Sequence, residues 1–284
     1  MVQQFEAFKS ITLKHGSGAS AEIYPYGAHL CSWRCAKGEE RIFLSRQAKF
    51  EQGAAIRGGV PIIFPQFNEF GAGPRHGFAR NVVWVMGGVS PSGDSCTFTL
   101  ESSDATRKAW PYDFTCEYKV TLGAESLRLQ FAVTNTGGTE AAFTAALHSY
   151  LRVEDLYLVS VDGLKGLSFW DNDGTEFSQR KNQLDNTLKF NGAIDRVYFD
   201  CSQAFQLREK NKTLLVASEG FEDVVIWNPG AEGASCMGDM GDEEFKYMLC
   251  IEAARIERPI TLAAGETWVG AQTLTLKPES DDAR

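Results

Sequence analysis

The sequence lacks the features that mark membrane, secreted and nucleic-acid-binding proteins. No apolar run approaches the roughly 18 to 20 residues needed to cross a bilayer, and the start MVQQFEAFKS has no basic segment followed by an apolar one, as a signal peptide would. Its 28 Lys and Arg residues are outnumbered by 37 Asp and Glu, for a net charge of −9, whereas a phosphate backbone requires a basic face. We therefore expect a cytoplasmic monomer that engages neither membrane nor nucleic acid.

Cysteine spacing gives no sign of a disulfide framework or a zinc site. The seven cysteines are an odd number scattered over long spans. Only Cys31 and Cys35 lie close together, and a CxxxC spacing without a second Cys or His pair gives poor support for zinc. Buried, reduced thiols that act as small hydrophobic side chains are the better interpretation.

A sustained helical period is also missing, and short β-prone runs broken by turns take its place. Alternation is visible in Cys96-Thr97-Phe98-Thr99-Leu100, the pattern of a sheet with one buried face. The candidate strands are residues 21–24, 29–34, 82–86, 95–101, 114–122, 127–134, 141–151, 156–161, 196–199, 204–208, 212–218, 224–228, 247–252, 260–262 and 270–276. No Pro/Ser-rich linker interrupts them. The sequence therefore predicts an all-β fold, one large antiparallel β-sandwich over residues 1–284, with a frayed polar tail at 278–284.

Residues 57–80, RGGVPIIFPQFNEFGAGPRHGFAR, have the composition of a binding site. Five glycines and three prolines shape the backbone around two short apolar runs. Arg57, Arg75 and Arg80 are planar donor forks suited to oxyanions and sugar hydroxyls, and His76 can donate or accept a hydrogen bond. A surface loop with solvated charges is the alternative, and chain-wide features make it the weaker one.

Groups able to move protons are scarce, because the chain has only four histidines. His148 stands in AALHSYLRV, where an apolar strand abruptly presents polar side chains; a satisfied core histidine is an equal alternative. Glu252 follows the apolar run 247–251 and precedes two alanines. Such an environment should raise its pKa and make it a candidate general base, although it could also be the first polar residue past a strand.

Six motifs in order resemble the glucose-6-phosphate 1-epimerase (hexose-6-phosphate mutarotase) branch of the aldose 1-epimerase family. They are RGGVPIIFPQF with RHGFAR, ALHSYLRV, DRVYFD, VVIWNPG and DMGDEEFKYMLCIEAA, and they extend from about residue 21 to 272. The resemblance implies a galactose-mutarotase-like supersandwich, which agrees with the strand pattern. It also implies a sugar phosphate as substrate, with neither metal nor organic cofactor.

The resemblance also suggests roles for individual residues. It makes His148 the general acid on the ring oxygen and Glu252 the base for the anomeric hydroxyl. Substrate contacts would come from Arg57, Arg75, His76, Arg80 and Asp195. Arg75 departs from the family pattern, in which a neutral residue such as glutamine often precedes the His-Gly pair, and the added cation would favour phosphate.

Three functions are consistent with these residues. The first is anomer interconversion of D-glucose 6-phosphate, the second is the same chemistry on neutral aldoses, and the third is a non-catalytic carbohydrate-binding sandwich. Arginines in an otherwise acidic chain favour the phosphorylated substrate, because a phosphate dianion accepts bidentate, charge-assisted bonds that a hydroxymethyl group cannot accept. A purely binding protein would have no use for the His148 and Glu252 pair.

Overall fold

The computed structural model describes residues 7–172 and 179–277. Its main elements are strands arranged in three sheets, and all pairings between the named strands are antiparallel. The predicted all-β antiparallel sandwich is confirmed. The predicted tail at 278–284 lies outside the described residues.

The largest sheet has nine strands among the described residues, in the order β14, β11, β16, β17, β20, β8, β7, β6, β5. In that order they span Thr187–Lys189, Ser160–Asp162, Phe205–Glu209, Lys212–Glu219, Thr267–Lys277, Ser126–Asn135, Phe114–Leu122, Ser95–Glu101 and Val85–Val89. Alternate residues of β8 are buried, which is why an alternating sequence forms this layer.

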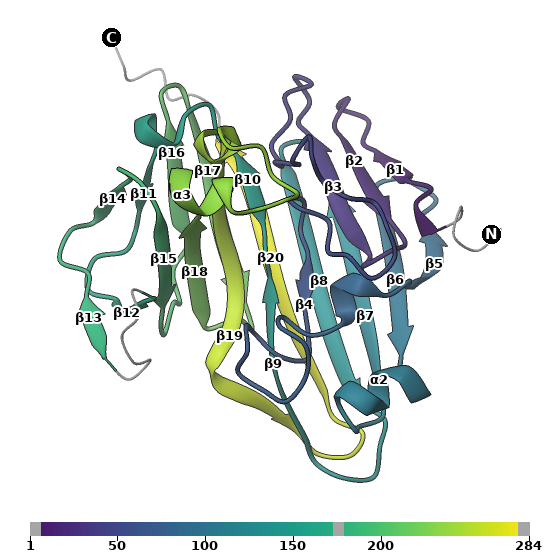
Figure 1. Ribbon diagram of the computed structural model, residues 1–284. Helices are drawn as coiled ribbons and strands as arrows, with labels where there is room; N and C mark the ends of the chain where they lie inside the picture. The colour runs from purple at the N-terminus through teal and green to yellow at the C-terminus, as the bar shows by residue number, and fades with distance from the viewer. Residues whose placement is uncertain (1–6, 173–178, 278–284) are drawn as a thin grey trace.

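The eight-stranded sheet carries the order β13, β12, β15, β18, β19, β9, β4, with β10 paired to β19. These strands span Arg180–Asn182, Ser168–Asp171, Ile194–Tyr198, Asp223–Asn228, Met248–Leu262, Ala141–Leu147, Ile62–Ile63 and, for β10, Tyr150–Arg152. The third sheet consists of β1 (Ile11–Lys14), β2 (Ser20–Tyr24) and β3 (His29–Arg34). Figure 1 shows the long strands β19 and β20 in the middle of the molecule.

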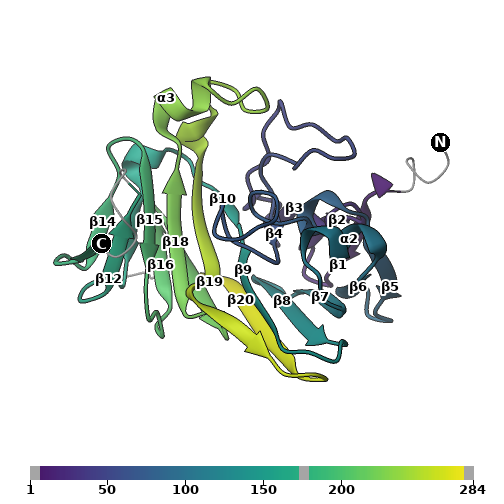
Figure 2. The same cartoon turned by 60° about the horizontal axis from the view of Figure 1, so that its bottom comes forward.

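Helices are short and lie in the connections between strands. They are η1 (Ala79–Asn81), α2 (Asp104–Ala109), η2 (Leu156–Leu158), α3 (Gly230–Ser235) and η3 (Glu244–Tyr247). Figure 2 shows α3 standing beyond the upper ends of β18 and β19. None of the helices in the described ranges is long and apolar enough to span a membrane.

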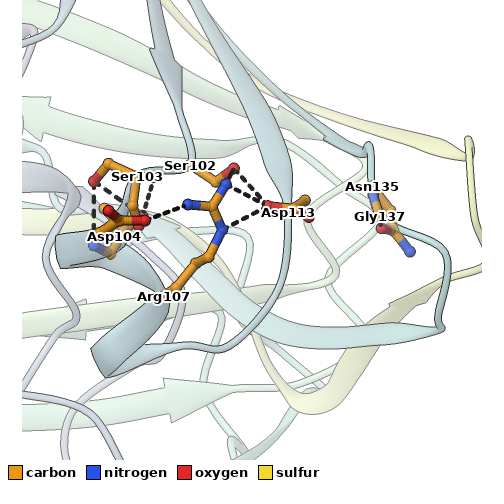
Figure 3. Close-up of polar contacts among 8 residues, drawn as sticks. Ser102, Ser103, Asp104, Arg107, Asp113, Asn135 and Gly137 are labelled. Atoms are coloured by element: carbon orange, nitrogen blue, oxygen red, sulfur yellow. Dashed lines mark hydrogen bonds and ion pairs between the residues drawn. The ribbon is translucent and has the colours of Figure 1, made fainter.

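Helix α2 is fastened to the nine-stranded sheet by an exposed polar network (Figure 3). Ser103 caps the helix in a capping box, and Arg107 binds Asp113 at 2.7 Å and Asp104 at 3.1 Å. Such exposed ion pairs contribute little to stability because water competes for both partners.

One large hydrophobic cluster of buried residues includes side chains from Leu13 to Leu274. At its centre Phe64 contacts five other aromatic rings, with ring centroids 5.2 to 5.9 Å apart, namely Phe78, Trp110, Phe114, Phe131 and Phe143. This continuity supports the expected single domain, which stays a prediction.

Several local predictions need correction. The strand expected over 156–161 begins instead as η2, because the Asp155 side chain accepts a hydrogen bond from the Tyr157 N–H and caps a helical turn. The strand expected over 141–151 is broken at His148 and Ser149. All seven cysteines are free thiols, and six are buried as predicted, but Cys236 is exposed.

Candidate active site

Residues 57–80, which we call the recognition stretch, lie beside the segment that carries His148. The two are joined because β4 pairs with β9, with Ile62 opposite Leu147. The contact continues beyond the strands: the His148 N–H donates to the Pro61 carbonyl, and the Tyr150 N–H donates to the Gly59 carbonyl, both at 3.0 Å. Gly59 has φ +66°, and a Cβ there would overlap the His29 ring, so only glycine fits this approach. The backbone thus fixes residues 57–61 beside 148–150.

The other side of the site comes from three neighbouring strands of the eight-stranded sheet. Glu252 of β19 is opposite Val225 of β18, and Trp227 of β18 is opposite Asp195 of β15. Residues two apart on one strand face the same side of a sheet. These side chains therefore converge on one face, next to the break between β9 and β10.

A cavity of about 170 Å³ forms where the two parts meet. Its walls include all seven predicted site residues: Arg57, Arg75, His76, Arg80, His148, Asp195 and Glu252. The remaining wall residues are Phe67, Asn68, Tyr150, Trp170, Asn172, Val225, Trp227 and Met237. The structure therefore brings together every residue singled out from the sequence.

His148 and Glu252 form a close buried pair. Nδ1 of His148 lies 3.2 Å from Oε1 of Glu252, and the two residues are 8% and 1% exposed. The contact has the distance of an ion pair but not the alignment of a hydrogen bond, since His148 Nδ1 and Glu252 Oε2 have no hydrogen-bond partner among the described residues. Buried polar groups are nearly always hydrogen-bonded, so these atoms mark a place for a polar ligand.

Burial shifts the pKa of each member of this pair toward its uncharged form. Burial raises the pKa of Glu252 well above its usual range, Asp195 adds to this effect, and Arg80 opposes it. Burial lowers the pKa of His148 well below its usual range, assisted by His76, Arg80 and Arg57. Burial therefore favours one proton on the pair, carried by Glu252, as coupled groups in a low dielectric share protons.

Three arginines supply the positive side of the cavity. Arg57 donates from Nε to Asp239 and from Nη1 to the Tyr150 hydroxyl, both at 3.1 Å. Burial opposes the charge of Arg57, but Tyr150 and Asp239 outweigh it and hold its pKa above the usual value.

Arg80 is partly buried and has fewer hydrogen-bond partners than Arg57. It donates from Nη2 to the Arg75 carbonyl at 3.1 Å, while its buried Nε has no partner among the described residues. Burial lowers the pKa of Arg80 to about 10, and the charges of Arg57 and Arg75 add to this against Tyr150 and Glu252. Such crowding of cations would be relieved by an anion.

His76 is a fixed hydrogen-bond donor rather than a base. Its ring Nδ1 accepts from the Asn68 backbone N–H at 3.1 Å, and the His76 backbone N–H donates to the Asn68 carbonyl at 2.9 Å. Burial lowers its pKa to about 3, with Arg80, Arg75 and Arg57 adding to the effect. The neutral ring must therefore carry its proton on Nε2.

Gln66 secures the loop that presents His76. Its Nε2 donates to the Asn68 carbonyl at 3.2 Å, and its Oε1 accepts from the Gly73 N–H at 2.7 Å. The Gln66 side-chain amide therefore links Asn68 to Gly73 within the loop that leads to His76.

Asp195 is also set for polar recognition. Asn172 donates to its Oδ2 at 2.9 Å. Burial raises the pKa of Asp195, while the bond from Asn172 and the charge of Arg75 oppose the shift. A carboxylate held this way can accept hydrogen bonds from two neighbouring hydroxyls.

Sequence reasoning missed Asp239, which binds Arg57 from 182 residues away, and Tyr150, which lies directly against His148. Tyr150 could have been found from its spacing, since it follows His148 by two residues. Asp239 opens the motif DMGDEEFKYMLCIEAA, but nothing in the local sequence indicates that its partner is Arg57. His148 and Glu252 also belong, with Cys250, to a group whose potential metal-binding atoms lie within 4.8 Å of one another; of the three, only His148 and Glu252 are among the cavity walls.

Comparisons with known proteins show which sequences this chain resembles. The family model described as aldose 1-epimerase matches residues 9–275. A protein of Cenchrus ciliaris named "Putative glucose-6-phosphate 1-epimerase" is 36% identical, over 99% of this chain and 88% of its own length. An Escherichia coli protein of the same name is 37% identical, over 80% of this chain and 77% of its own.

Solved structures show the same likeness. The crystal structure of "a putative mutarotase (YeaD)" from Salmonella typhimurium has a TM-score of 0.86 and 32% identity, covering 95% of this chain and 90% of its own.

Proposed function

Because the chain belongs to the aldose 1-epimerase family, we propose that it is an isomerase that interconverts the α and β anomers of D-glucose 6-phosphate. One observation carries the proposal: a buried acid and base pair, His148 and Glu252, shares a single cavity with three arginines. The pair provides the proton transfers, and the arginines provide the anion site.

The reaction relocates two protons on a hemiacetal. Glu252 takes the proton of the anomeric hydroxyl while His148 gives a proton to the ring oxygen. The bond between C1 and the ring oxygen breaks, and an open-chain aldehyde results. Rotation about C1–C2 presents the other face of the carbonyl, and closure reverses both transfers. General acid and base groups each contribute roughly 10² to 10⁴ in rate.

Burial of the pair favours the ring-opened stage. After ring opening the proton resides on Glu252 and His148 is neutral, the same distribution that burial alone favours. For the closed ring the pair needs the opposite distribution, with His148 charged. A bound phosphate would support it by neutralising the arginines, whose charges lower the pKa of His148.

A phosphorylated substrate is supported by the arginines more than by the sugar-binding groups. A phosphate dianion accepts bidentate, charge-assisted bonds, and Arg80 has a buried donor that lacks a partner among the described residues. Asp195 and the His76 Nε2–H are suited to sugar hydroxyls, which a neutral aldose also has. The names of the relatives point to glucose 6-phosphate.

The proposal includes a cytoplasmic monomer whose partner is the sugar phosphate and which binds no nucleic acid. The net charge of −9 supports the last point. Seven free thiols, six of them buried, suit a reducing compartment.

The test is anomerisation of glucose, galactose and their 6-phosphates, followed by polarimetry or exchange NMR. We expect His148→Ala and Glu252→Gln to abolish the acceleration for glucose 6-phosphate while substrate binding stays within a few-fold. His15→Ala is the matched control, because His15 is a partly exposed residue that precedes a turn, binds Ser17 and is not among the cavity walls. Wild-type rates in both site variants would overturn the proposal.

A further inference from the structure

Tyr150 contacts both halves of the site, and the mechanism above gives it no role. We propose that Tyr150 is a positioning residue that couples phosphate recognition to proton transfer, its ring holding the His148 imidazole and its hydroxyl holding the Arg57 guanidinium. The inference rests on the proposed function and adds to it how the two halves are aligned.

The ring of Tyr150 fixes the plane of the His148 imidazole. The two rings are stacked, with centroids 4.7 Å apart and an angle of 9° between their planes. Trp227 meets the Tyr150 ring edge-on at 5.9 Å, and Phe43 stacks against it at 6.4 Å. Because Tyr150 is only 2% exposed, its ring has no room to turn away. The imidazole therefore has a flat support that sets its orientation toward the cavity.

The hydroxyl of Tyr150 fixes the Arg57 fork. It accepts a hydrogen bond from Nη1 at 3.1 Å, while Asp239 accepts from Nε at 3.1 Å. With two of its three nitrogens held, the planar guanidinium has a defined direction. A pre-oriented fork loses less freedom when it binds an anion, and part of the affinity for phosphate then depends on Tyr150.

The backbone makes this arrangement rigid. Tyr150 donates its N–H to Gly59, two residues after Arg57, and His148 donates its N–H to Pro61. The segment with the arginine and the segment with the histidine are thus joined on either side of the tyrosine. One side chain sets the separation between the phosphate position and the proton-transfer position, which a hexose 6-phosphate must match.

The first variant is Tyr150→Phe, which keeps the ring and removes the hydroxyl. We expect the KM for glucose 6-phosphate to rise about tenfold, with kcat within about twofold of the wild type. The KM for free glucose should not change, because Arg57 has no phosphate to bind there. A merely structural tyrosine would not produce this difference between the two sugars.

The second variant is Tyr150→Leu, which also removes the flat ring. We expect kcat to fall about 30-fold on both sugars, because the imidazole loses its support, and the Phe variant should restore kcat. Tyr118→Leu is the control for loss of a buried ring, because Tyr118 is 0% exposed, belongs to β7 and is not among the cavity walls: it should lower the unfolding temperature without changing KM or kcat. If Tyr150→Leu does not fold, Tyr150→Phe decides the part of the inference that concerns Arg57 and the phosphate.

Two results would overturn the inference: an unchanged KM for glucose 6-phosphate, or equal KM changes for both sugars, in Tyr150→Phe. A folded Tyr150→Leu with wild-type kcat would overturn the part that concerns His148. His148→Ala separates these failures from failure of the proposed function. If His148→Ala is inactive while the Tyr150 variants behave as wild type, only the role of Tyr150 is wrong.

Discussion

The proton-transfer pair and the recognition stretch line the same cavity, and they differ in how far they are exposed to solvent. His148 and Glu252 are 8% and 1% exposed, next to or within long strands. Arg57 and Arg80 are partly buried and Arg75 is exposed, all three on loops or a single helical turn. Solvent is therefore excluded more completely from the proton-transfer pair than from the arginines that would bind the anion.

This difference has a chemical cause. Carboxyl and imidazole groups respond to burial by giving up their charge, so burial brings them to the states between which protons are exchanged. A guanidinium keeps its charge under the same treatment: burial lowers the pKa of Arg80 only to about 10. The same low dielectric thus favours the neutral forms of His148 and Glu252 and leaves the arginines as cations.

The largest effect expected in the recognition stretch comes from loss of an arginine. Arg57→Ala or Arg80→Ala should raise the KM for glucose 6-phosphate about 10- to 100-fold. Hydrogen bonds to charged groups are worth roughly 1.5 to 3 kcal/mol, and each 1.4 kcal/mol is about tenfold in affinity. The KM for free glucose should change only a few-fold. Initial rates of anomerisation on both sugars give the comparison.

Arg107→Ala is the matched control, because it removes an arginine from the exposed network of Figure 3. It should leave both KM values unchanged. If Arg57→Ala and Arg80→Ala raised KM equally for the two sugars, these arginines would not be the phosphate-binding groups, and the phosphate site would lie elsewhere.

The proton-transfer pair, His148 and Glu252, was largely predictable from the sequence. An apolar run around Glu252 predicts a strand interior, and burial with a raised pKa follows directly. His148 was placed within a strand and lies instead in a short break between β9 and β10. That break depends on pairing with residues 59–61, a contact between segments nearly 90 residues apart that no local pattern encodes.

For the recognition stretch, the sequence predicted a binding-site composition but not the geometry of the loop. Its arginines and glycines indicate a binding site, yet His76 has φ +63°, an uncommon backbone conformation for histidine. The Asn68 bonds that hold it there arise only in the folded loop. Asp239 was missed for the same reason, since its partner Arg57 is distant in sequence.

A smaller effect is expected from the loop's internal support. Gln66→Ala should raise KM about tenfold for both sugars, because the Asn68 and Gly73 bonds that hold His76 in place are lost. The matched control is Gln203→Ala, which removes an exposed amide bound to Gly163. A KM effect confined to the phosphorylated sugar would show that the loop serves the arginines rather than His76.

The smallest catalytic effect is expected at His29, which lies beneath the recognition stretch and outside the cavity walls. His29 is 2% exposed. Burial lowers its pKa to about 3, against a smaller opposing effect of a hydrogen bond with the Gly58 backbone. His29→Gln should therefore leave anomerisation at pH 7 unchanged and act on stability alone.

The sign of that stability effect follows from proton linkage. Below the unfolded pKa of about 6.5 the unfolded chain binds a proton at His29, whereas the folded chain does not bind one until about pH 3. The stabilisation is present above pH 6.5 and is lost as pH falls toward 3. Between pH 7 and pH 5 the wild type should lose about 2 kcal/mol more unfolding free energy than His29→Gln. Urea unfolding at both pH values measures the difference. Equal losses in the two proteins would mean that His29 is hydrated in solution. Residues 58 and 59 would then pack less closely against His29 than the contacts indicate.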